Sequence, residues 1–210
     1  MSNIAETLRA EILKGLPGTE VQWEMASLDR VFLGFPRIPR SDTRKAAVLL
    51  LLYQHKGLVH TVFIQRPKYK GVHSGQISFP GGRAEPDDKD LIETALREAK
   101  EEVGIDPSRI SVLGTLTPLF IPVSNMLVTP VLGWTDVRPE FKIQTEEVVF
   151  LIDGDLAKFL EPSIIKIKQF EVRGEMRDLK YFDYKGYVIW GATAMMLNEL
   201  LVIIKRSRIL

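Results

Sequence analysis

The amino-terminal third of the chain contains one clearly periodic segment. Ile4, Leu8 and Ile12 recur at helical spacing, which predicts a helix over residues 3–14. Proline and glycine interrupt any period in residues 16–43. We therefore expect a loop there, with at most one short element.

The middle of the chain has the pattern of strands. Residues 45–53 (KAAVLLLLY) are apolar on both faces, as expected for a central strand, and residues 58–66 alternate loosely. A turn separates them. After a loop at 68–75, the sequence predicts further strands at 76–79, 109–119, 127–134, 145–152, 165–172 and 179–189.

The chain ends in a second helical pattern. Ala192, Met196, Leu200 and Ile203 would form its apolar face over residues 190–204. Helices and strands thus occur in mixed order, which favours an α+β fold or an α/β/α layered one. No linker or repeat divides the chain. We expect a single domain over 1–210, with 1–43 as a helix and loop extension.

The segment that follows the short strand carries the candidate chemistry. Pro80, Gly81 and Gly82 should break the strand sharply, and the acids at 87, 88 and 90 can cap a helix that ends near Val103 before Gly104. On a helical wheel, one stripe is apolar and should face the core; it holds Ile92, Ala95, Leu96, Ala99 and Val103. The carboxylates of Glu98, Glu101 and Glu102 form a neighbouring sector.

Three like charges at this spacing repel one another and destabilise a helix. A hard divalent cation such as Mg²⁺ would remove the conflict, because it prefers oxygen ligands. Arg97 stands four residues before Glu101 and can orient its carboxylate. The alternative is a solvated acidic face. The Gly81-Gly82 turn favours the metal site, since glycine lets the backbone approach a ligand and offer a carbonyl.

Composition limits the classes of function. The 210 residues contain 28 basic and 27 acidic side chains, a net charge of +1, which argues against long nucleic acid as a partner. The absence of cysteine excludes disulfides, thiolate metal sites and a cysteine nucleophile. The longest apolar run, 46–53, is too short to span a bilayer. We expect a cytoplasmic protein without a membrane partner; a homodimer is left open.

With these residues in place, the sequence resembles the Nudix hydrolase family. Its motif is a Gly, five residues, a Glu, seven residues and R-E-x-x-E-E-x-G followed by a hydrophobic residue. The second half is complete, from Arg97 to Ile105. The first half departs: Lys89 occupies the position of the supporting Glu, Gly82 is one residue out of register, and Asp88 is the nearest acid.

The preceding run resembles the coenzyme A diphosphatase branch of that family, which has L-L-T-x-R-S-x-x-x-R-x-x-x-G-x-x-x-F-P-G-G. Here VFIQRPKYKGVHSGQISFPGG (62–82) matches at Arg66, Gly75 and 79–82. It departs in having Ile64 for Thr, Pro67 for Ser and Gly71 for Arg, with Lys70 beside it. The segments 119–134 and 187–197 also resemble the branch.

The resemblance implies an α/β/α sandwich with a mixed sheet and a hydrolase that cleaves a diphosphate bond. Coenzyme A or a derivative would be the small-molecule substrate, and Mg²⁺ or Mn²⁺ the cofactor. The resemblance assigns the metal to Glu98, Glu102, Glu101, the Gly82 backbone and a further acid, Glu147. One of the helix carboxylates would act as the general base, with the choice among them left open. Arg97 would orient the carboxylate of Glu101.

The substrate side is expected upstream of the helix. Arg66, Lys70, His73 and Gly81 are candidates for contact with phosphate. For His73 a structural role is the alternative, and Trp190 is expected in the core rather than stacked on a base. ADP-ribose, a dinucleotide or capped RNA are alternative substrates. A ligand-sensing domain without catalysis is a further alternative, but such domains usually lose the helix glutamates, and all three are present here.

Overall fold

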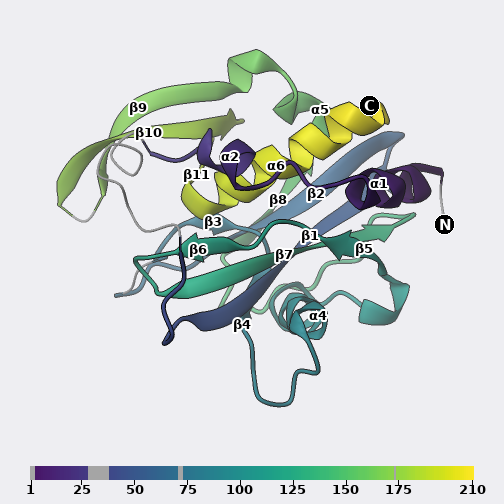
Figure 1. Ribbon diagram of the computed structural model, residues 1–210, viewed down its shortest axis with the longest axis horizontal. Helices are drawn as coiled ribbons and strands as arrows, with labels where there is room; N and C mark the ends of the chain where they lie inside the picture. The colour runs from purple at the N-terminus through teal and green to yellow at the C-terminus, as the bar shows by residue number, and fades with distance from the viewer. Residues whose placement is uncertain (1–2, 28–37, 71–72, 173) are drawn as a thin grey trace.

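A mixed β-sheet forms the centre of the molecule in the computed structural model, which describes residues 3–27, 38–70, 73–172 and 174–210 (Figure 1). The strands of this sheet in the described residues are β1 (Arg44–His55), β2 (Leu58–Gln65), β3 (Ile77–Ser78), β4 (Gly81–Arg83), β5 (Ser111–Thr115), β6 (Leu119–Ile121), β7 (Met126–Thr135) and β8 (Phe150–Asp155).

Strand β1 has different partners along its two edges. On one edge it runs parallel to β7 over residues 44–53. On the other edge, β2 pairs with residues 52–55, whereas β4 pairs with residues 46–48. Two strands, both antiparallel to β1, therefore share this edge. The glycine turn that precedes the acidic helix is built into this fork.

Helices cover both faces of the main sheet, which confirms the α+β fold with an α/β/α arrangement. Figure 1 shows α4 (Leu91–Val103) on one face, with α6 (Gly191–Ser207) and α1 (Asn3–Leu13) on the other. A second sheet of three strands lies beside α6. Its strands are β9 (Ile165–Val172), β10 (Glu175–Tyr184) and β11 (Tyr187–Trp190). The remaining short helical elements are α2 (Thr19–Trp23), η1 (Pro107–Arg109), α5 (Leu156–Phe159) and η2 (Pro162–Ile164).

The alternation of side chains along β1 explains why this strand is central. Leu50 and Leu52 pack in the core under α6, whereas Leu49 and Leu51 pack in the core against α4. All four are essentially without solvent exposure. The run that is apolar on both faces is thus divided between two hydrophobic cores, as predicted for a strand between two helical layers.

Helix α4 begins and ends where its capping residues predict. The carboxylate of Asp90 accepts the N–H groups of Ile92 and Glu93, at 2.9 and 2.8 Å. Gly104 ends the helix in the left-handed conformation, with φ of 69°. The predicted apolar stripe faces the core: Ala95, Ala99 and Val103 are fully buried there, with Ile92 and Leu96 packed beside them.

Helix α6 is more buried than the predicted single apolar face requires. Its buried residues include the polar Asn198 and Glu199, because α6 also contacts α1, α2, β10 and β11. Glu199 accepts hydrogen bonds from Gln22 Nε2 at 2.8 Å, from Thr117 N at 3.2 Å and from Gly18 N at 3.1 Å. The carboxylate thereby fixes the segment around α2 to the helix.

Several boundaries differ from the predictions, each for a local reason. The strand predicted at 109–119 is η1 followed by β5 and β6, since Pro118 interrupts it. The strand predicted at 145–152 begins only at Phe150. The strand predicted at 179–189 is a hairpin, with Lys185 and Gly186 at positive φ between β10 and β11. The expected break at 80–82 instead leads directly into β4.

Other predictions on the first third of the chain are confirmed or fall outside the described part. The helix at 3–14 and the short element within 16–43 correspond to α1 and α2. Residues 28–37 of that loop, and Gly71, lie outside the described residues. The single-domain organisation stays a prediction. Among the described helices, none combines the length and apolarity needed to cross a membrane.

Candidate active site

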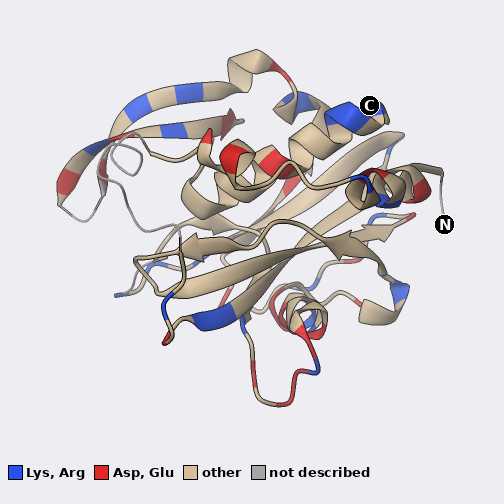
Figure 2. Cartoon of the chain, in the orientation of Figure 1, with Lys and Arg blue, Asp and Glu red and all other residues tan. Residues whose placement is uncertain are grey.

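A cavity of about 950 Å³ lies beside the acidic helix. Glu98 and Glu102 line it, and Glu102 is only 1% exposed. The side chain of Glu101 is 53% exposed and is not among the lining residues. Figure 2 shows acidic residues on α4 and along the loop before it. The three predicted carboxylates are thus neighbours on the helix, but two of them face the cavity directly.

The glycine turn touches both cavity carboxylates. The N–H group of Gly81 donates to Glu102 Oε2 at 2.7 Å. A Cβ atom on Gly82 would lie 2.5 Å from Glu98 Oε1, so Glu98 occupies space that only glycine leaves open. On its other side, a Cβ on Gly81 would lie 2.5 Å from Val48 Cα in β1. The two glycines therefore let the turn fit between the central strand and the acidic helix.

Arg97 connects the carboxylates on the open side of the helix. Its Nη1 donates to Glu98 Oε1 and to Glu101 Oε2, both at 3.0 Å. The predicted pairing with Glu101 is therefore present, but it is one part of a larger network. The guanidinium also donates to Asp88, through Nε at 2.9 Å and Nη2 at 3.1 Å, and to the Arg83 carbonyl at 3.0 Å.

Asp88 takes the supporting role of the Glu that is absent from the first half of the motif. Its carboxylate accepts from Arg97, from Thr94 Oγ1 at 2.8 Å and from Glu85 N at 2.9 Å. The hydrogen bonds from Arg97 hold the pKa of Asp88 well below its ordinary value. An acid one position away from the usual Glu thus fixes Arg97, and Lys89 is not needed for this role.

The cavity carboxylates carry incompletely compensated negative charge. Burial raises the pKa of Glu102 from 4.5 to about 7, although Arg66 and the Gly81 N–H favour the charged form. Burial also raises the pKa of Glu98. Glu98 and Glu147 add repulsion at Glu102. A cation in the cavity would stabilise the charged forms of these groups.

Glu147 reaches the cavity through the turn before β8. In this turn Gln144 N donates to the Glu102 carbonyl at 3.0 Å, and Glu147 N donates to Gln144 O at 3.0 Å. Val148 is fully buried in the core against α4. Docking of this turn on the end of α4 places the exposed Glu147 side chain among the cavity residues. The predicted further acid therefore lies where it can contribute to the same site.

The chemistry of these donors fits a hard divalent cation held by few protein ligands. Among the described residues, no set of three acids or histidines is close enough to form a closed metal cage. Mg²⁺ rarely uses such cages; one or two carboxylates usually hold it, together with water and substrate phosphates. The carboxylates of Glu98 and Glu102, with Glu147 beside them, supply oxygen donors of this kind.

The predicted substrate residues divide into two groups. Arg66, His73 and Gly81 line the cavity, whereas Lys70 is exposed and is not among the lining residues. His73 also meets Gln76, with Nδ1 at 3.1 Å from Oε1. The side chain of Arg66 points toward Gly81 and helix α4. Its Nη2 lies 2.7 Å from the Gly81 carbonyl and 3.2 Å from Glu102 Oε1.

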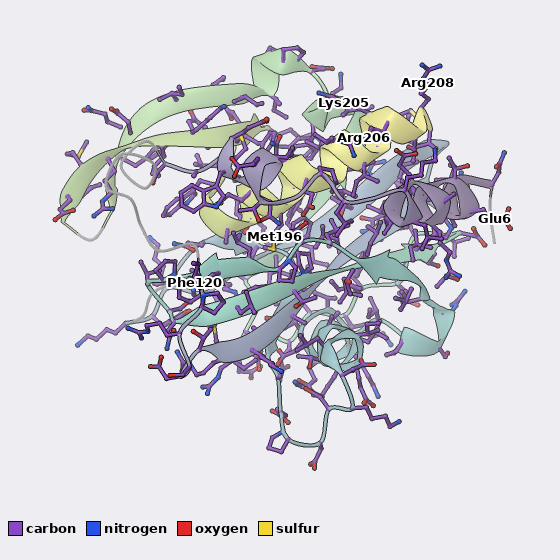
Figure 3. The ribbon with its side chains drawn as sticks, viewed as in Figure 1. Glu6, Phe120, Met196, Lys205, Arg206 and Arg208 are labelled. Atoms are coloured by element: carbon purple, nitrogen blue, oxygen red, sulfur yellow. The ribbon has the colours of Figure 1, made fainter. Side chains whose placement is uncertain are left out.

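The far wall of the cavity comes from the second sheet and α6. No motif in the sequence predicted that these elements would line the cavity. Trp190, expected in the core, is partly exposed and lines the cavity together with Met195, Met196 and Leu179. Figure 3 shows Met196 on the side of α6 that faces the main sheet. The cavity therefore has an acidic end and an apolar end. Phe120, in contrast, is buried and does not line the cavity.

Comparison with known proteins identifies the domain. The NUDIX domain model matches residues 43–184. Nudix hydrolase 15, mitochondrial, from Arabidopsis thaliana is 38% identical over 165 residues, which cover 75% of this chain and 58% of that protein. The uncharacterized Nudix hydrolase NudL from Photorhabdus laumondii is 33% identical over 175 residues, which cover 82% and 93%. The chain thus spans little more than half the length of the Arabidopsis relative.

Solved structures show the same fold at low sequence identity. RenU, a Nudix hydrolase from M. smegmatis, has a TM-score of 0.56 at 14% identity, covering 82% of this chain and 96% of that one. The MutT protein from Methanosarcina mazei Go1 has a TM-score of 0.51 at 17% identity, covering 80% and 96%. From the domain match and the relatives, the chain belongs to the Nudix hydrolase family.

Proposed function

We propose that this chain hydrolyses the diphosphate bond of a nucleoside diphosphate derivative in the presence of Mg²⁺ or Mn²⁺, and that coenzyme A or one of its thioesters is the substrate. The observation that carries the proposal is the pair of carboxylates, the buried Glu102 and the partly buried Glu98, packed on the Gly81-Gly82 segment at the acidic end of a cavity. The positions of the carboxylates bear on the reaction, and the apolar end of the cavity bears on the choice of substrate.

The roles of the residues follow from their positions. Glu98 and Glu102 would hold the metal ion, with Glu147, the more exposed Glu101 and the Gly82 carbonyl as additional oxygen donors. A bound divalent cation would neutralise the diphosphate and lower the pKa of a coordinated water. Arg97 limits the conformations of Glu98 and Glu101, because its Nη1 contacts both carboxylates.

Hydrolysis needs a water to lose a proton and to attack one phosphorus. A carboxylate of α4 would accept that proton, the new P–O bond would form, and the bridging P–O bond would break with its electrons on the leaving phosphate. The raised pKa values of Glu98 and Glu102 belong to the site without a cation, and a bound cation would favour the charged forms of both groups. The geometry leaves open which of the carboxylates accepts the proton.

The apolar end of the cavity supports coenzyme A over ADP-ribose. Trp190, Met195 and Met196 offer an adaptable apolar wall that a polar ribose would leave uncovered. A pantetheine arm, or the acyl group of a thioester, would bury against it. The match to the coenzyme A branch at Arg66, Gly75 and 79–82 agrees with this substrate, whereas Ile64 and Pro67 depart from it.

A substrate panel with product identification tests the proposal. Coenzyme A, an acyl-coenzyme A, ADP-ribose and a dinucleotide polyphosphate are incubated with Mg²⁺ and with Mn²⁺, and products are identified by mass spectrometry. We expect 3′,5′-ADP from the coenzyme A compounds, with kcat/KM at least about tenfold above that for ADP-ribose, since the apolar contacts are worth about 1–3 kcal/mol. Preferred cleavage of ADP-ribose would contradict the substrate assignment. A cytoplasmic location and a homodimer stay predictions.

A further inference from the structure

Arg66 stands at the point where β2 ends and the main sheet divides. Its main-chain N–H donates to the Gln76 carbonyl at 3.0 Å, which fixes the residue to the strand that precedes the glycine turn. Its Nε donates to Ser78 Oγ at 3.1 Å. Arg66 is therefore held both at its main chain and at its guanidinium group.

The Nη2 group of Arg66 closes a ring of contacts with the turn and the helix. It donates to the Gly81 carbonyl at 2.7 Å and lies 3.2 Å from Glu102 Oε1. The other oxygen of Glu102 accepts the Gly81 N–H at 2.7 Å. Both polar groups of Gly81 and both oxygens of Glu102 are thus held by this one arrangement. A substrate phosphate that bound Nη2 would have to compete with these contacts.

The same ring fixes Glu98 indirectly. Gly82 follows Gly81 in β4, and the carboxylate of Glu98 lies in the space where a Cβ of Gly82 would be. The position of the turn therefore determines where Glu98 can lie, and Arg66 helps to determine the position of the turn. Arg66 also provides a positive charge 3.2 Å from Glu102, which is almost fully buried.

We infer that Arg66 is a positioning residue: it ties the Gly81 carbonyl to Glu102 and so holds the two cavity carboxylates in the arrangement that binds a divalent cation. This inference rests on the proposed function, because it concerns the same metal site. It replaces the role that the sequence suggested for Arg66, a direct ligand of the substrate phosphate. The two roles predict different kinetic and binding behaviour.

The test compares Arg66→Met with Arg109→Met, the same change at an exposed arginine that does not line the cavity. Mn²⁺ binding without substrate is measured by electron paramagnetic resonance, and kcat and KM are measured at saturating Mg²⁺. For Arg66→Met we expect Mn²⁺ affinity to fall at least about tenfold and kcat about 100-fold, with KM changed less than about threefold, because a displaced ligand set impairs the reaction more than substrate binding. Arg109→Met should match the wild type in all three.

Milder variants keep the test decisive if Arg66→Met fails to fold. Ser78→Ala removes the partner of Nε while the charge of Arg66 stays, so we expect smaller losses in Mn²⁺ affinity and kcat with unchanged KM. Arg66→Lys keeps the charge but cannot reproduce the forked contacts, and should recover only part of the Mn²⁺ affinity.

Two results would overturn the inference. One is a rise in KM for Arg66→Met with Mn²⁺ affinity and kcat as in the wild type, because a residue that only binds substrate behaves in this way. If Arg66→Met fails to fold, the same result for Arg66→Lys and Ser78→Ala has the same meaning. The other is an unchanged or increased Mn²⁺ affinity, which would make Arg66 a competitor of the metal. Failure of the wild-type protein itself to bind Mn²⁺ would instead refute the proposed function, and is distinguished by that control.

Discussion

The contact between Gly82 and Glu98 allows a small change to separate activity from stability. In Gly82→Ala the new Cβ would lie 2.5 Å from Glu98 Oε1. Carbon and oxygen atoms pack at about 3.5 Å, so the carboxylate has to move by about 1 Å. Because the atoms in the way belong to the end of a flexible side chain, the fold can accommodate the methyl group while the carboxylate is displaced.

The expected magnitude follows from that displacement. A misplacement of about 1 Å in a catalytic group costs about 100-fold in rate, which corresponds to about 2.7 kcal/mol. We expect kcat of Gly82→Ala with Mg²⁺ to fall by this factor. The melting temperature should stay within about 3 °C of the wild type, since an alanine in an unstrained backbone tends to stabilise.

Gly81→Ala is the matched comparison. Its Cβ would meet the backbone of β1 at Val48 Cα, and its φ of 150° is strained for any residue with a side chain. We expect a destabilisation of about 3 kcal/mol, or a decrease of roughly 6–12 °C in melting temperature. Calorimetry and steady-state kinetics on both variants provide the assay. Wild-type kcat in Gly82→Ala would refute the placement of Glu98 at the reacting site.

Three further predictions concern charged groups. In EDTA, the free energy of unfolding should fall by at most about 3 kcal/mol between pH 4.5 and 7, because the raised pKa of Glu102 means that the folded state binds the proton more tightly than the unfolded chain does. Denaturant titrations of Glu102→Gln should show a shallower fall over this range, and an equally steep one would exclude Glu102 as the source. Asp88→Asn should lose about 2 kcal/mol in urea unfolding at pH 7 by weakening the bonds to Arg97. The deficit should shrink below about pH 4, because the unfolded chain then takes up a proton at Asp88 while the lowered pKa keeps the folded carboxylate charged; a deficit independent of pH would argue against this. Glu199→Gln should lower the free energy of unfolding in urea by about 2 kcal/mol, because it weakens the hydrogen bond from Gln22. Its Mn²⁺ affinity should equal that of the wild type, and a changed affinity would link α6 to the metal site.

Local signals in the sequence identify α4 well. Asp90 and Gly104 set its ends, and the apolar stripe fixes which side faces the core, so the directions of Glu98 and Glu102 follow from helical geometry. The sequence does not show that Glu101 is more exposed than its neighbours. That difference arises because Glu102 lies against the Gly81 N–H and Arg66, whereas Glu101 pairs with Arg97 at the surface.

Contacts between distant segments account for most of what the sequence left open. Glu147 joins the site because the turn before β8 docks on the end of α4, an interaction that leaves no periodic signal. Trp190 reaches the cavity because β11 pairs with β10 in a separate sheet. The two-residue turn at Lys185–Gly186 was a detectable signal for this hairpin, whereas the fork at β1 was not.

Mg²⁺-dependent turnover of coenzyme A by the wild type and by Glu102→Gln tests the central claim most directly. Product release is followed by mass spectrometry, and equal circular dichroism spectra and melting temperatures in the metal-free state at pH 6 establish that both proteins are folded. The account predicts 3′,5′-ADP from the wild type and a rate at least about 100-fold lower in Glu102→Gln. Equal turnover by the two folded proteins would contradict it, because the buried carboxylate would then have no part in the reaction.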